Sequence, residues 1–345
     1  MSPSLPRLAV TMGDPAGIGP EICARALLDP SALAWCRPVL VGDRTALFSA
    51  LSDALHMQAE IHTIGRPAEG VFEPGVINLI DLGLLRDAPC PIGQVSALGG
   101  ECAFRYVERA IRLAMDGEAD ATVTAPLNKE ALHLAGHPFA GHTEIYAHLT
   151  GCKNYTMMLA HQHVRMVHVS THVSLREACD RVKKTRVLSV IRLAHEACQS
   201  FGIARPRIAV AGLNPHSGEG GLFGREEVEE ILPAVQAARG EGFCVDGPIP
   251  PDTVFCKLNA GLYDVCVAMY HDQGHIPVKL LGFTYDEAQG RWNAVSGVNI
   301  TMGLPIIRVS VDHGTAFDIA GKGIAACDSL MSAMDYAARM ALHRA

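Results

Sequence analysis

The chain has 345 residues, of which 49% are hydrophobic and 19% are charged, and its formal net charge is −7. This composition predicts a globular protein, and its acidic balance argues against nucleic acid as a partner. No apolar stretch approaches the ~20 residues that a membrane-spanning helix needs, so we expect no membrane span. Because single domains usually have about 100–200 residues, the length predicts two domains.

The eleven cysteines are scattered along the chain without any Cys-x-x-Cys pair. Such scatter favours reduced thiols packed as small hydrophobic residues over a disulfide framework or a thiolate metal cluster. Residues 1–10 contain no apolar segment that would precede a signal-peptide cleavage site. We therefore expect a cytoplasmic protein, and no single thiol stands out as a nucleophile.

Short apolar and β-branched runs predict strands, and three-and-four spacing of apolar residues predicts helices at 103–115, 175–198 and 226–239. Alternation of this kind favours an α/β fold with a largely parallel sheet. In chain order, the strands are expected at Arg7–Thr11, Val39–Gly42, Val76–Asp81, Ala121–Thr124, Met157–Ala160, Arg165–Ser170, Arg207–Gly212, Val265–Tyr270 and Ile306–Val311.

The first predicted strand runs into a glycine-rich turn, after which Pro20 opens a helix. Proline suits a first helical turn, and glycines before it let the backbone approach a ligand closely. The spacing of Gly13, Gly17 and Gly19 differs from the dinucleotide-binding fingerprint. The turn therefore predicts ligand contact, with a plain strand-to-helix connection as the simpler alternative.

Three of the predicted strands lead directly to a histidine, namely His172, His216 and His271. In open α/β sheets, ligands bind beyond the carboxyl ends of the strands. Neutral imidazole is a common ligand of zinc, and three protein ligands with an open position are typical of catalytic zinc. The pattern predicts a catalytic metal site, although strand ends also collect unrelated polar residues.

Near the other end of the chain, His313–Gly323 alternates small residues with hydrogen-bonding ones, which suits a loop around a flat or phosphorylated ligand. This loop, and the Asp-x-x-Gly-Ile-Gly-Pro-Glu turn that begins at Asp14, resemble two signatures of the isocitrate and isopropylmalate dehydrogenases. In that superfamily the second loop forms the adenosine part of the NAD site. The resemblance implies two α/β domains with a cleft between them that holds metal, substrate and NAD.

Seven further motifs resemble the 4-hydroxythreonine-4-phosphate dehydrogenase family. In order they are Gly141-His-Thr-Glu144, Gly212-Leu-Asn-Pro-His-Ser-Gly-Glu-Gly220, Pro251-Asp-Thr253, Tyr270-His-Asp-Gln-Gly274, Pro277-x-Lys279, Gly297-Val-Asn-Ile-Thr301 and Arg308 to Gly314. The resemblance implies NAD-dependent oxidation of a 4-phosphorylated 3-hydroxy acid, such as 4-phosphohydroxy-L-threonine or threonate 4-phosphate, with loss of CO₂. It also implies a place in pyridoxine biosynthesis, a homodimer, and a divalent metal, zinc before magnesium or cobalt.

Residue by residue, the resemblance places the metal ligands on His172, His216 and His271, the same three that follow the predicted strands. The family shares its metal between the chains of a dimer, so His271 is expected to complete the site of the second chain. The implied substrate contacts are His142, Thr143, Lys279, Asn299 and Arg308, which suit a phosphate and a carboxylate. The implied cofactor contacts are Gly13, Asp14, His313, Gly314, Thr315 and Asp318.

Asp252 and Lys279 are the candidate catalytic residues, and the choice of general base stays open between them. Asp252 is also interpretable as a turn cap and Lys279 as a simple phosphate contact. His142 is ambiguous in the same way, because Gly-His-Thr-Glu resembles a helix start capped by Thr143. We expect structural roles for His168 and His275.

We expect a first domain over residues 1–130 and 300–345 that carries the cofactor loops, and a second over 131–299 that carries the metal ligands and dimer contacts. Thr284–Ser296 is an insertion relative to the family, and it precedes Asn299. Tyr285 and Trp292 suggest a hairpin lid over the substrate, with a solvated loop tip as the alternative.

Other functions stay open at this stage. Relatives of the family dehydrogenate aromatic cis-dihydrodiols such as that of terephthalate, and a dicarboxylate dihydrodiol could use the same cations. A metal-dependent hydrolase would use the three histidines to activate water, but it would not need the His313–Gly323 loop. A sensor without catalytic activity would bind NAD or a phosphate ester without turnover.

Overall fold

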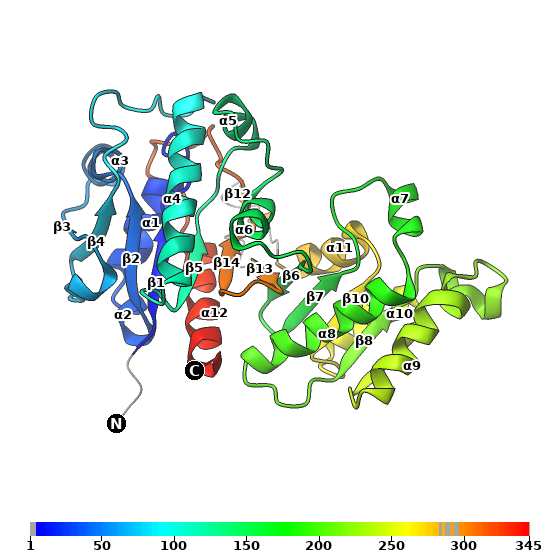
Figure 1. Ribbon diagram of the computed structural model, residues 1–345. Helices are drawn as coiled ribbons and strands as arrows, with labels where there is room; N and C mark the ends of the chain where they lie inside the picture. Colours follow the sequence, from blue (N-terminus) through cyan, green and yellow to red (C-terminus); the bar gives the residue numbers. More distant parts are fainter. Residues whose placement is uncertain (1–4, 283–284, 287–290, 293–296, 345) are drawn as a thin grey trace. The chain divides into compact units, whose positions relative to one another are not determined.

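The computed structural model describes residues 5–282, 285–286, 291–292 and 297–344. The chain divides into two compact units, Met1–Lys153 with Leu304–Ala345, and Asn154–Gly303. In Figure 1 the first unit runs from blue through cyan to the green of α5 (Lys129–Leu134) and α6 (His142–Thr150) and also has the red end of the chain, whereas the second runs from green to orange. Both units are α/β structures.

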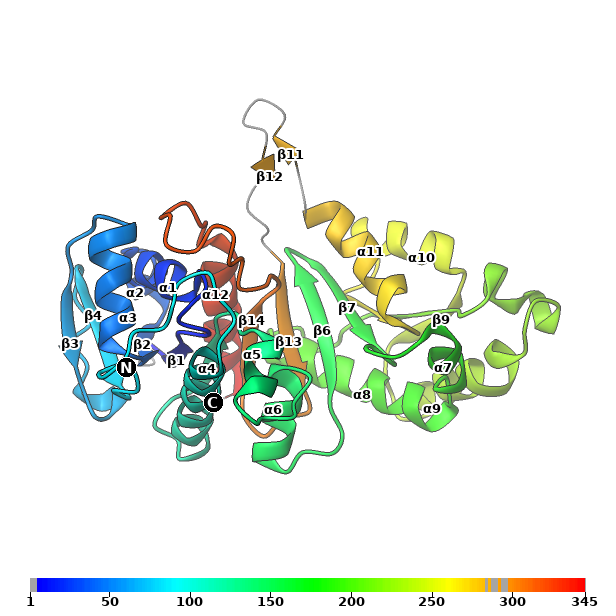
Figure 2. The ribbon, with the colours of Figure 1, turned by 90° about the horizontal axis from the view of Figure 1, so that it is seen from above.

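The first unit contains a parallel sheet with the strand order β3-β4-β2-β1-β5-β14. Figure 2 shows α4 (Ala97–Met115) on one face of this sheet and α1 (Gly19–Leu28) with α12 (Asp328–Arg344) on the other. Because both faces are covered, most strands are continuous buried runs. The strands are β1 (Arg7–Thr11), β2 (Arg37–Gly42), β3 (Glu60–Thr63), β4 (Val76–Asp81), β5 (Ala121–Thr124) and β14 (Arg308–Val311).

The second unit has the strand order β13-β6-β7-β10-β8-β9. Strand β6 is antiparallel to both of its neighbours, whereas β7, β10, β8 and β9 run parallel. The strands are β6 (Thr156–His161), β7 (Val164–His168), β8 (Ile208–Ala211), β9 (Val245–Ile249), β10 (Val265–Ala268) and β13 (Val298–Met302). The helices include α7 (Leu175–Asp180), α8 (Lys184–Ser200), α9 (Leu232–Gly240), α10 (Pro251–Asn259) and α11 (His271–Gly282).

Every strand predicted from the sequence is present, with its ends shifted by a few residues at most. Strands β3, β9 and β13 were missed because β3 is largely exposed, β9 contains Gly247 and Pro248, and β13 mixes polar and apolar residues. The prediction of one helix over 175–198 was wrong. The chain leaves the helical conformation at Lys183, so α7 and α8 are separate helices.

Residues 131–153 belong to the first unit and not, as expected, to the second. The reason is that α5 (Lys129–Leu134) and α6 (His142–Thr150) pack on α4. Phe104 of α4 shares a buried cluster with Leu132 of α5 and Ile145 of α6. Burial of these large apolar side chains stabilises the packing of residues 131–153 in the first unit.

All eleven cysteines are free thiols, as the scatter predicted. Within the described part of the chain, no helix combines the length and apolar character that crossing a membrane requires. In the insertion, the short strands β11 (Tyr285–Asp286) and β12 (Arg291–Trp292) pair antiparallel, with Tyr285 opposite Trp292, so the predicted hairpin is present (Figure 2). The rest of Thr284–Ser296, and with it the proposed lid, lies outside the described residues.

The contact between α4 and α5 is close enough to exclude any side chain at Gly100. A Cβ atom at this position would lie 1.9 Å from the carbonyl oxygen of Ala131. The following loop is held to the same helix, because Nε2 of His137 lies 2.6 Å from Oε2 of Glu101 and the His137 ring stacks on Phe104. This packing fixes the segment that leads to His142.

We expect Gly100→Ala to destabilise the protein by about 1–3 kcal/mol, because the methyl group forces α5 away from α4. Gly240→Ala is the matched control, since a Cβ there meets nothing within 4 Å. That variant should be neutral or slightly stabilising, because alanine is the better helix former. Urea or thermal unfolding compares the two. Equal midpoints for both variants would contradict the close packing.

Candidate active site

Three strands of the second unit, β7, β10 and β8, are neighbours that run parallel. His172 follows β7, His271 follows β10 and His216 follows β8. Because carboxyl ends of parallel strands share one edge of a sheet, all three histidines lie beyond the same edge. The three strands and their parallel direction are as the sequence predicted, their order in the sheet is new from the structure, and the role of these histidines as ligands stays a prediction.

The rings of His172 and His271 lie close together within one chain, with 5.9 Å between their centroids. Both line a cavity of about 450 Å³. Nδ1 of His271 lies 2.6 Å from Oδ1 of Asp272, which leaves Nε2 of His271 as the atom able to bind a ligand. Among the residues that the structure describes, no three His, Cys, Asp or Glu side chains within the chain are grouped closely enough to hold a metal ion.

Two buried histidines support the His271 ring. His275 stacks on His271 with 3.7 Å between ring centroids, and its ring lies 4.7 Å from that of His168. Burial lowers the pKa of His168 to about 3 and the pKa of His275 to about 4. Both imidazoles are therefore neutral at pH 7 and add no positive charge beside His271.

His216 lies in an unusual left-handed turn, in which five successive residues from His216 to Gly220 have φ angles between 43° and 77°. Three of them, His216, Ser217 and Glu219, carry side chains. Each residue of this kind costs about 1–2 kcal/mol in the left-handed region. The turn therefore persists only because its surroundings hold it, and the ring of His216 packs against Phe223, 6.2 Å away.

In the first unit, Arg308 is a buried cation at the start of β14, only 2% exposed. Its guanidinium donates a 2.9 Å hydrogen bond to Oγ1 of Thr124 and lies over the ring of Tyr146, 5.6 Å from the centroid. Burial, followed by the charge of Arg308, keeps the pKa of His142 well below its usual value. This neutral imidazole and fixed guanidinium suit an anionic ligand group.

The other predicted substrate and catalytic residues each lie on a helix or strand of the structure, and they are Thr143, Lys279, Asp252 and Asn299. Thr143 is half-buried in the first turn of α6 and does not cap it, because the cap position is Gly141, without a side-chain bond. Lys279 is exposed on α11 and Asp252 is exposed in the first turn of α10. Asn299 lies on β13, where Nδ2 is 2.6 Å from Sδ of Met157.

The glycine-rich turn after β1 is tightly built. Gly13 has φ +75°, and a Cβ there would lie 2.3 Å from the carbonyl oxygen of Pro126. Asp14 is fully buried, and its Oδ1 accepts a 2.9 Å hydrogen bond from the backbone of Ala16. Burial raises the pKa of Asp14 to about 6.

This turn is bonded to the loop His313–Gly323, so the two motifs from opposite ends of the chain meet. The backbone N–H of Ile18 donates to the carbonyl of Thr315 at 3.0 Å. The carboxylate of Glu21 accepts hydrogen bonds from the backbone of Gly321 at 2.5 Å and of Gly323 at 2.9 Å. Both segments are thereby fixed around the start of α1.

The two bonded segments line a cavity of about 400 Å³ in the first unit. Its lining includes Gly17, Glu21, Ala50, Asp53, Ala320 and Gly321, and as far as the described residues show it contains no lysine or arginine. The predicted cofactor residues Gly13, Asp14, His313, Gly314, Thr315 and Asp318 belong to these two segments, but none of them is among the residues that line the cavity.

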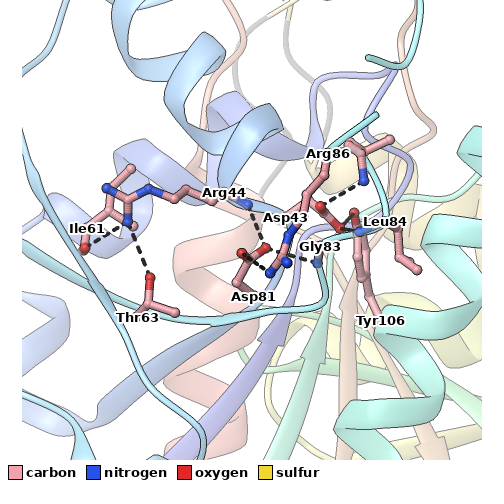
Figure 3. Close-up of polar contacts among 10 residues, drawn as sticks. Asp43, Arg44, Ile61, Thr63, Asp81, Gly83, Leu84, Arg86 and Tyr106 are labelled. Atoms are coloured by element: carbon pink, nitrogen blue, oxygen red, sulfur yellow. Dashed lines mark hydrogen bonds and ion pairs between the residues drawn. The ribbon is translucent and has the colours of Figure 1, made fainter. Parts of the chain in front are cut away.

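Two carboxylates at the ends of β2 and β4 hold backbone groups near this cavity, and Figure 3 shows their hydrogen bonds. Asp43, 1% exposed, accepts hydrogen bonds from the backbone of Leu84 at 3.1 Å and Leu85 at 3.0 Å, and from the hydroxyl of Tyr106 at 3.0 Å. Asp81 accepts from the backbone of Arg44 at 3.0 Å. Leu85 lines the cavity, so these bonds fix the position of one of its walls.

Sequence reasoning missed the residues that hold the predicted ones in place. Thr124 and Tyr146 contact Arg308, and Asp43 and Glu227 are buried carboxylates that accept backbone hydrogen bonds. The only signal in the sequence was an acid beside a glycine-rich or apolar run. That signal is too common to identify them.

A family model described as "Pyridoxal phosphate biosynthetic protein PdxA" matches residues 34–337. A curated D-threonate 4-phosphate dehydrogenase from Cupriavidus necator is 49% identical over 346 residues, covering 100% of each chain. A solved structure of 4-hydroxythreonine-4-phosphate dehydrogenase from Klebsiella pneumoniae is 47% identical, has a TM-score of 0.86, and is matched over 97% of this chain and 99% of its own.

A solved terephthalate 1,2-cis-dihydrodiol dehydrogenase from Burkholderia xenovorans is less similar, with 32% identity, a TM-score of 0.66, and coverage of 94% of this chain and 95% of its own. All three of these proteins are named dehydrogenases. The match of the family model over most of the chain, and the identity to these relatives over nearly its full length, agree with the resemblance seen in the motifs. The chain therefore belongs to the PdxA family and is an oxidoreductase.

Proposed function

We propose that the chain oxidises the C3 hydroxyl of a 4-phosphorylated 3-hydroxy acid with NAD and that the product then loses CO₂. The main support for this proposal is the full-length similarity to dehydrogenases of D-threonate 4-phosphate and 4-hydroxythreonine 4-phosphate. Both substrates share a phosphate, a carboxylate and a hydroxyl between them. The buried guanidinium of Arg308 is suited to one of the two anionic groups.

In the proposed reaction, the C3 hydroxyl loses its proton to a base while C3 transfers a hydride to the nicotinamide, which forms a ketone and NADH. The ketone is a β-keto acid, so the bond from C2 to the carboxylate breaks, CO₂ leaves and the resulting enol is protonated. Lys279 and Asp252 are the proposed proton carriers, and both are accessible to solvent on their helices.

We further propose that His172, His216 and His271 hold a divalent metal ion, zinc before magnesium or cobalt. The donor types fit, because all three are imidazoles, Asp272 orients Nε2 of His271, and the neighbouring His168 and His275 are neutral. When bound, such an ion polarises the substrate hydroxyl and eases loss of its proton.

The cavity of the first unit supports NAD as the proposed cofactor. It is lined by the glycine-rich turn and the loop that resembles an adenosine-binding segment, and its volume of about 400 Å³ suits one part of a dinucleotide. Glu21 and Asp53 are the charged residues of its lining. Carboxylates there would repel the extra phosphate of NADP, so we propose a preference for NAD.

The alternatives are weaker. The dihydrodiol dehydrogenase is less similar than the two enzymes of phosphorylated acids, with 32% identity against 49% and 47%. A hydrolase would leave the cavity beside the His313–Gly323 loop without a role. Membership in a family of pyridoxal phosphate biosynthetic proteins supports a role in that pathway, and the eleven free thiols suit a cytoplasmic location.

We also propose a homodimer in which the metal site is shared between chains. Large apolar side chains are exposed beside two of the proposed ligands, with Ile276 64% and Leu280 79% exposed on α11, and Leu222 73% exposed just after His216. Such surfaces are typical of protein interfaces. Sedimentation of the purified chain tests this proposal, and a stable monomer would contradict it.

Removal of the metal, or His172→Ala, is expected to lower NADH production by roughly a hundredfold or more, because the hydroxyl is no longer polarised. The assay follows NADH absorbance with D-threonate 4-phosphate, 4-phosphohydroxythreonine and a cis-dihydrodiol, each with NAD or NADP. His343→Ala, an exposed position at the end of α12, is the control and should retain activity. Full activity of the metal-free enzyme would falsify the metal assignment.

Arg308→Lys is expected to raise KM for the phosphorylated substrate at least about tenfold, because a lysine cannot reproduce the two-pronged contact of a guanidinium. Arg165→Lys is a matched control, since Arg165 also lies over an aromatic ring, 5.3 Å from the centroid of Phe201, but in the second unit. Both changes should lower stability, and only the first should change KM. An unchanged KM in Arg308→Lys rules out a substrate contact.

The raised pKa of Asp14, about 6 against 3.8, predicts a pH-dependent cost of folding. The folded protein binds the proton more strongly, so this group favours folding fully below pH 3.8 and loses that contribution as the pH rises through 6. Asp14→Asn mimics the protonated form. Without cofactor, the variant should be more stable than the wild type by about 1–3 kcal/mol at pH 8, and the difference should shrink towards pH 4.5. A difference independent of pH contradicts this assignment.

A further inference from the structure

The strained turn of His216 is held on one side by Glu227, which is 2% exposed. Its Oε1 accepts hydrogen bonds from the backbone N–H groups of Leu213 and Asn214, both at 2.7 Å. Its Oε2 accepts a 2.9 Å bond from the side-chain amide of Asn214. A single buried carboxylate therefore fixes the two residues that lead into the turn.

The same carboxylate packs against the turn itself. A Cβ atom at Gly218 would lie 2.7 Å from Oε2 of Glu227, and one at Gly212 would lie 2.8 Å from Oγ of Ser217. The backbone of Ser217 donates to the carbonyl of Asn214 at 3.1 Å. A side chain at Gly218 would push against the buried carboxylate of Glu227, and one at Gly212 would push against Ser217, so both glycines allow the turn to lie close to Glu227.

Gln273 holds the turn on its other side. This residue is 7% exposed, and its amide oxygen accepts a 2.7 Å hydrogen bond from the backbone of Met269. Its amide nitrogen donates a 2.7 Å bond to the carbonyl of Gly212. Met269 precedes His271 and Gly212 precedes His216, so one side chain ties together the two backbone segments that carry these histidines.

We propose that Gln273 and Glu227 are positioning residues that hold the backbone leading to His216 in place, so that each chain of the proposed dimer presents His216 and His271 correctly to the metal sites to which they contribute. This inference rests on the proposed function, which assigns both histidines to one kind of metal site. Neither residue is among the proposed substrate contacts or metal ligands. Both side chains act on His216 through the backbone of residues 212–214. We expect a large effect on the position of His216, because the strained left-handed turn relaxes once these contacts are removed.

The metal-stripped full-length chain is titrated with Co²⁺ in a calorimeter, for the wild type, Gln273→Met and Glu227→Gln. Gln273→Met keeps the length of the side chain and removes both bonds. Glu227→Gln keeps one oxygen that can accept from the backbone N–H groups. Its new amide nitrogen, however, faces the side-chain amide nitrogen of Asn214, and both of these groups are donors. We expect the dissociation constant of Co²⁺ to rise about 10–100-fold in both variants, as for other residues that orient ligands.

Asn78→Leu is the matched control. Asn78 is 4% exposed in the first unit, and like Gln273 it bridges one backbone N–H and one carbonyl, both of Val71 and both at 2.8 Å. Its loss should lower the thermal midpoint by a comparable amount and leave Co²⁺ binding unchanged. Gln273→Glu, which keeps the acceptor for Met269, serves if Gln273→Met does not fold, and it should weaken Co²⁺ binding as well.

Amide hydrogen exchange of residues 213–218 gives a second readout without metal. Exchange should quicken in Gln273→Met and Glu227→Gln and not in Asn78→Leu. Wild-type Co²⁺ affinity in both variants overturns the proposal. If the wild type itself binds no Co²⁺, the metal assignment fails separately, and the exchange data decide: quickened exchange supports positioning of His216, and unchanged exchange refutes it.

Discussion

The parallel pairing of β7, β10 and β8 is the constraint that places His172, His271 and His216 beyond one edge of the sheet. Val267 of β10 lies opposite Val167 on one side and Val210 on the other, so the three strands are held in one register. A slip by one residue would turn every buried side chain to the other face of the sheet. The apolar runs therefore fix where each strand ends at the edge of the sheet. The end of each strand in turn determines where the histidine that follows it lies.

The sequence was a good guide wherever burial alone decides the structure. Runs such as Ile208–Ala211 are covered on both faces and contain no polar residue, so they indicate strands and also the edge at which their histidines emerge. It was a poor guide where tertiary contacts decide. Gly247 and Pro248 hid strand β9, and the packing of α5 on α4 placed residues 131–153 in the first unit.

The contacts around the candidate site residues are a second example of structure that the sequence alone does not predict. Arg308 meets Thr124, which is 184 residues away in the chain, and Gln273 reaches Gly212 over 61 residues. No periodicity encodes such contacts, because they arise only when distant strands become neighbours. The left-handed conformation of His216 was equally hidden, since histidine and serine normally avoid positive φ angles. The motifs identified candidate site residues but did not predict their backbone conformation or their contacts.

The division of the chain also constrains the order in which the protein can fold. The second unit is one continuous segment, whereas the first is completed only by residues after position 303. Strand β14 must pair with β5, which is made much earlier, so this contact closes a very long loop. During synthesis, the sheet of the first unit therefore stays open along β5 until the last part of the chain emerges. An unpaired, apolar strand edge of this kind favours aggregation, so the first unit is open to misassembly until β14 has paired with β5.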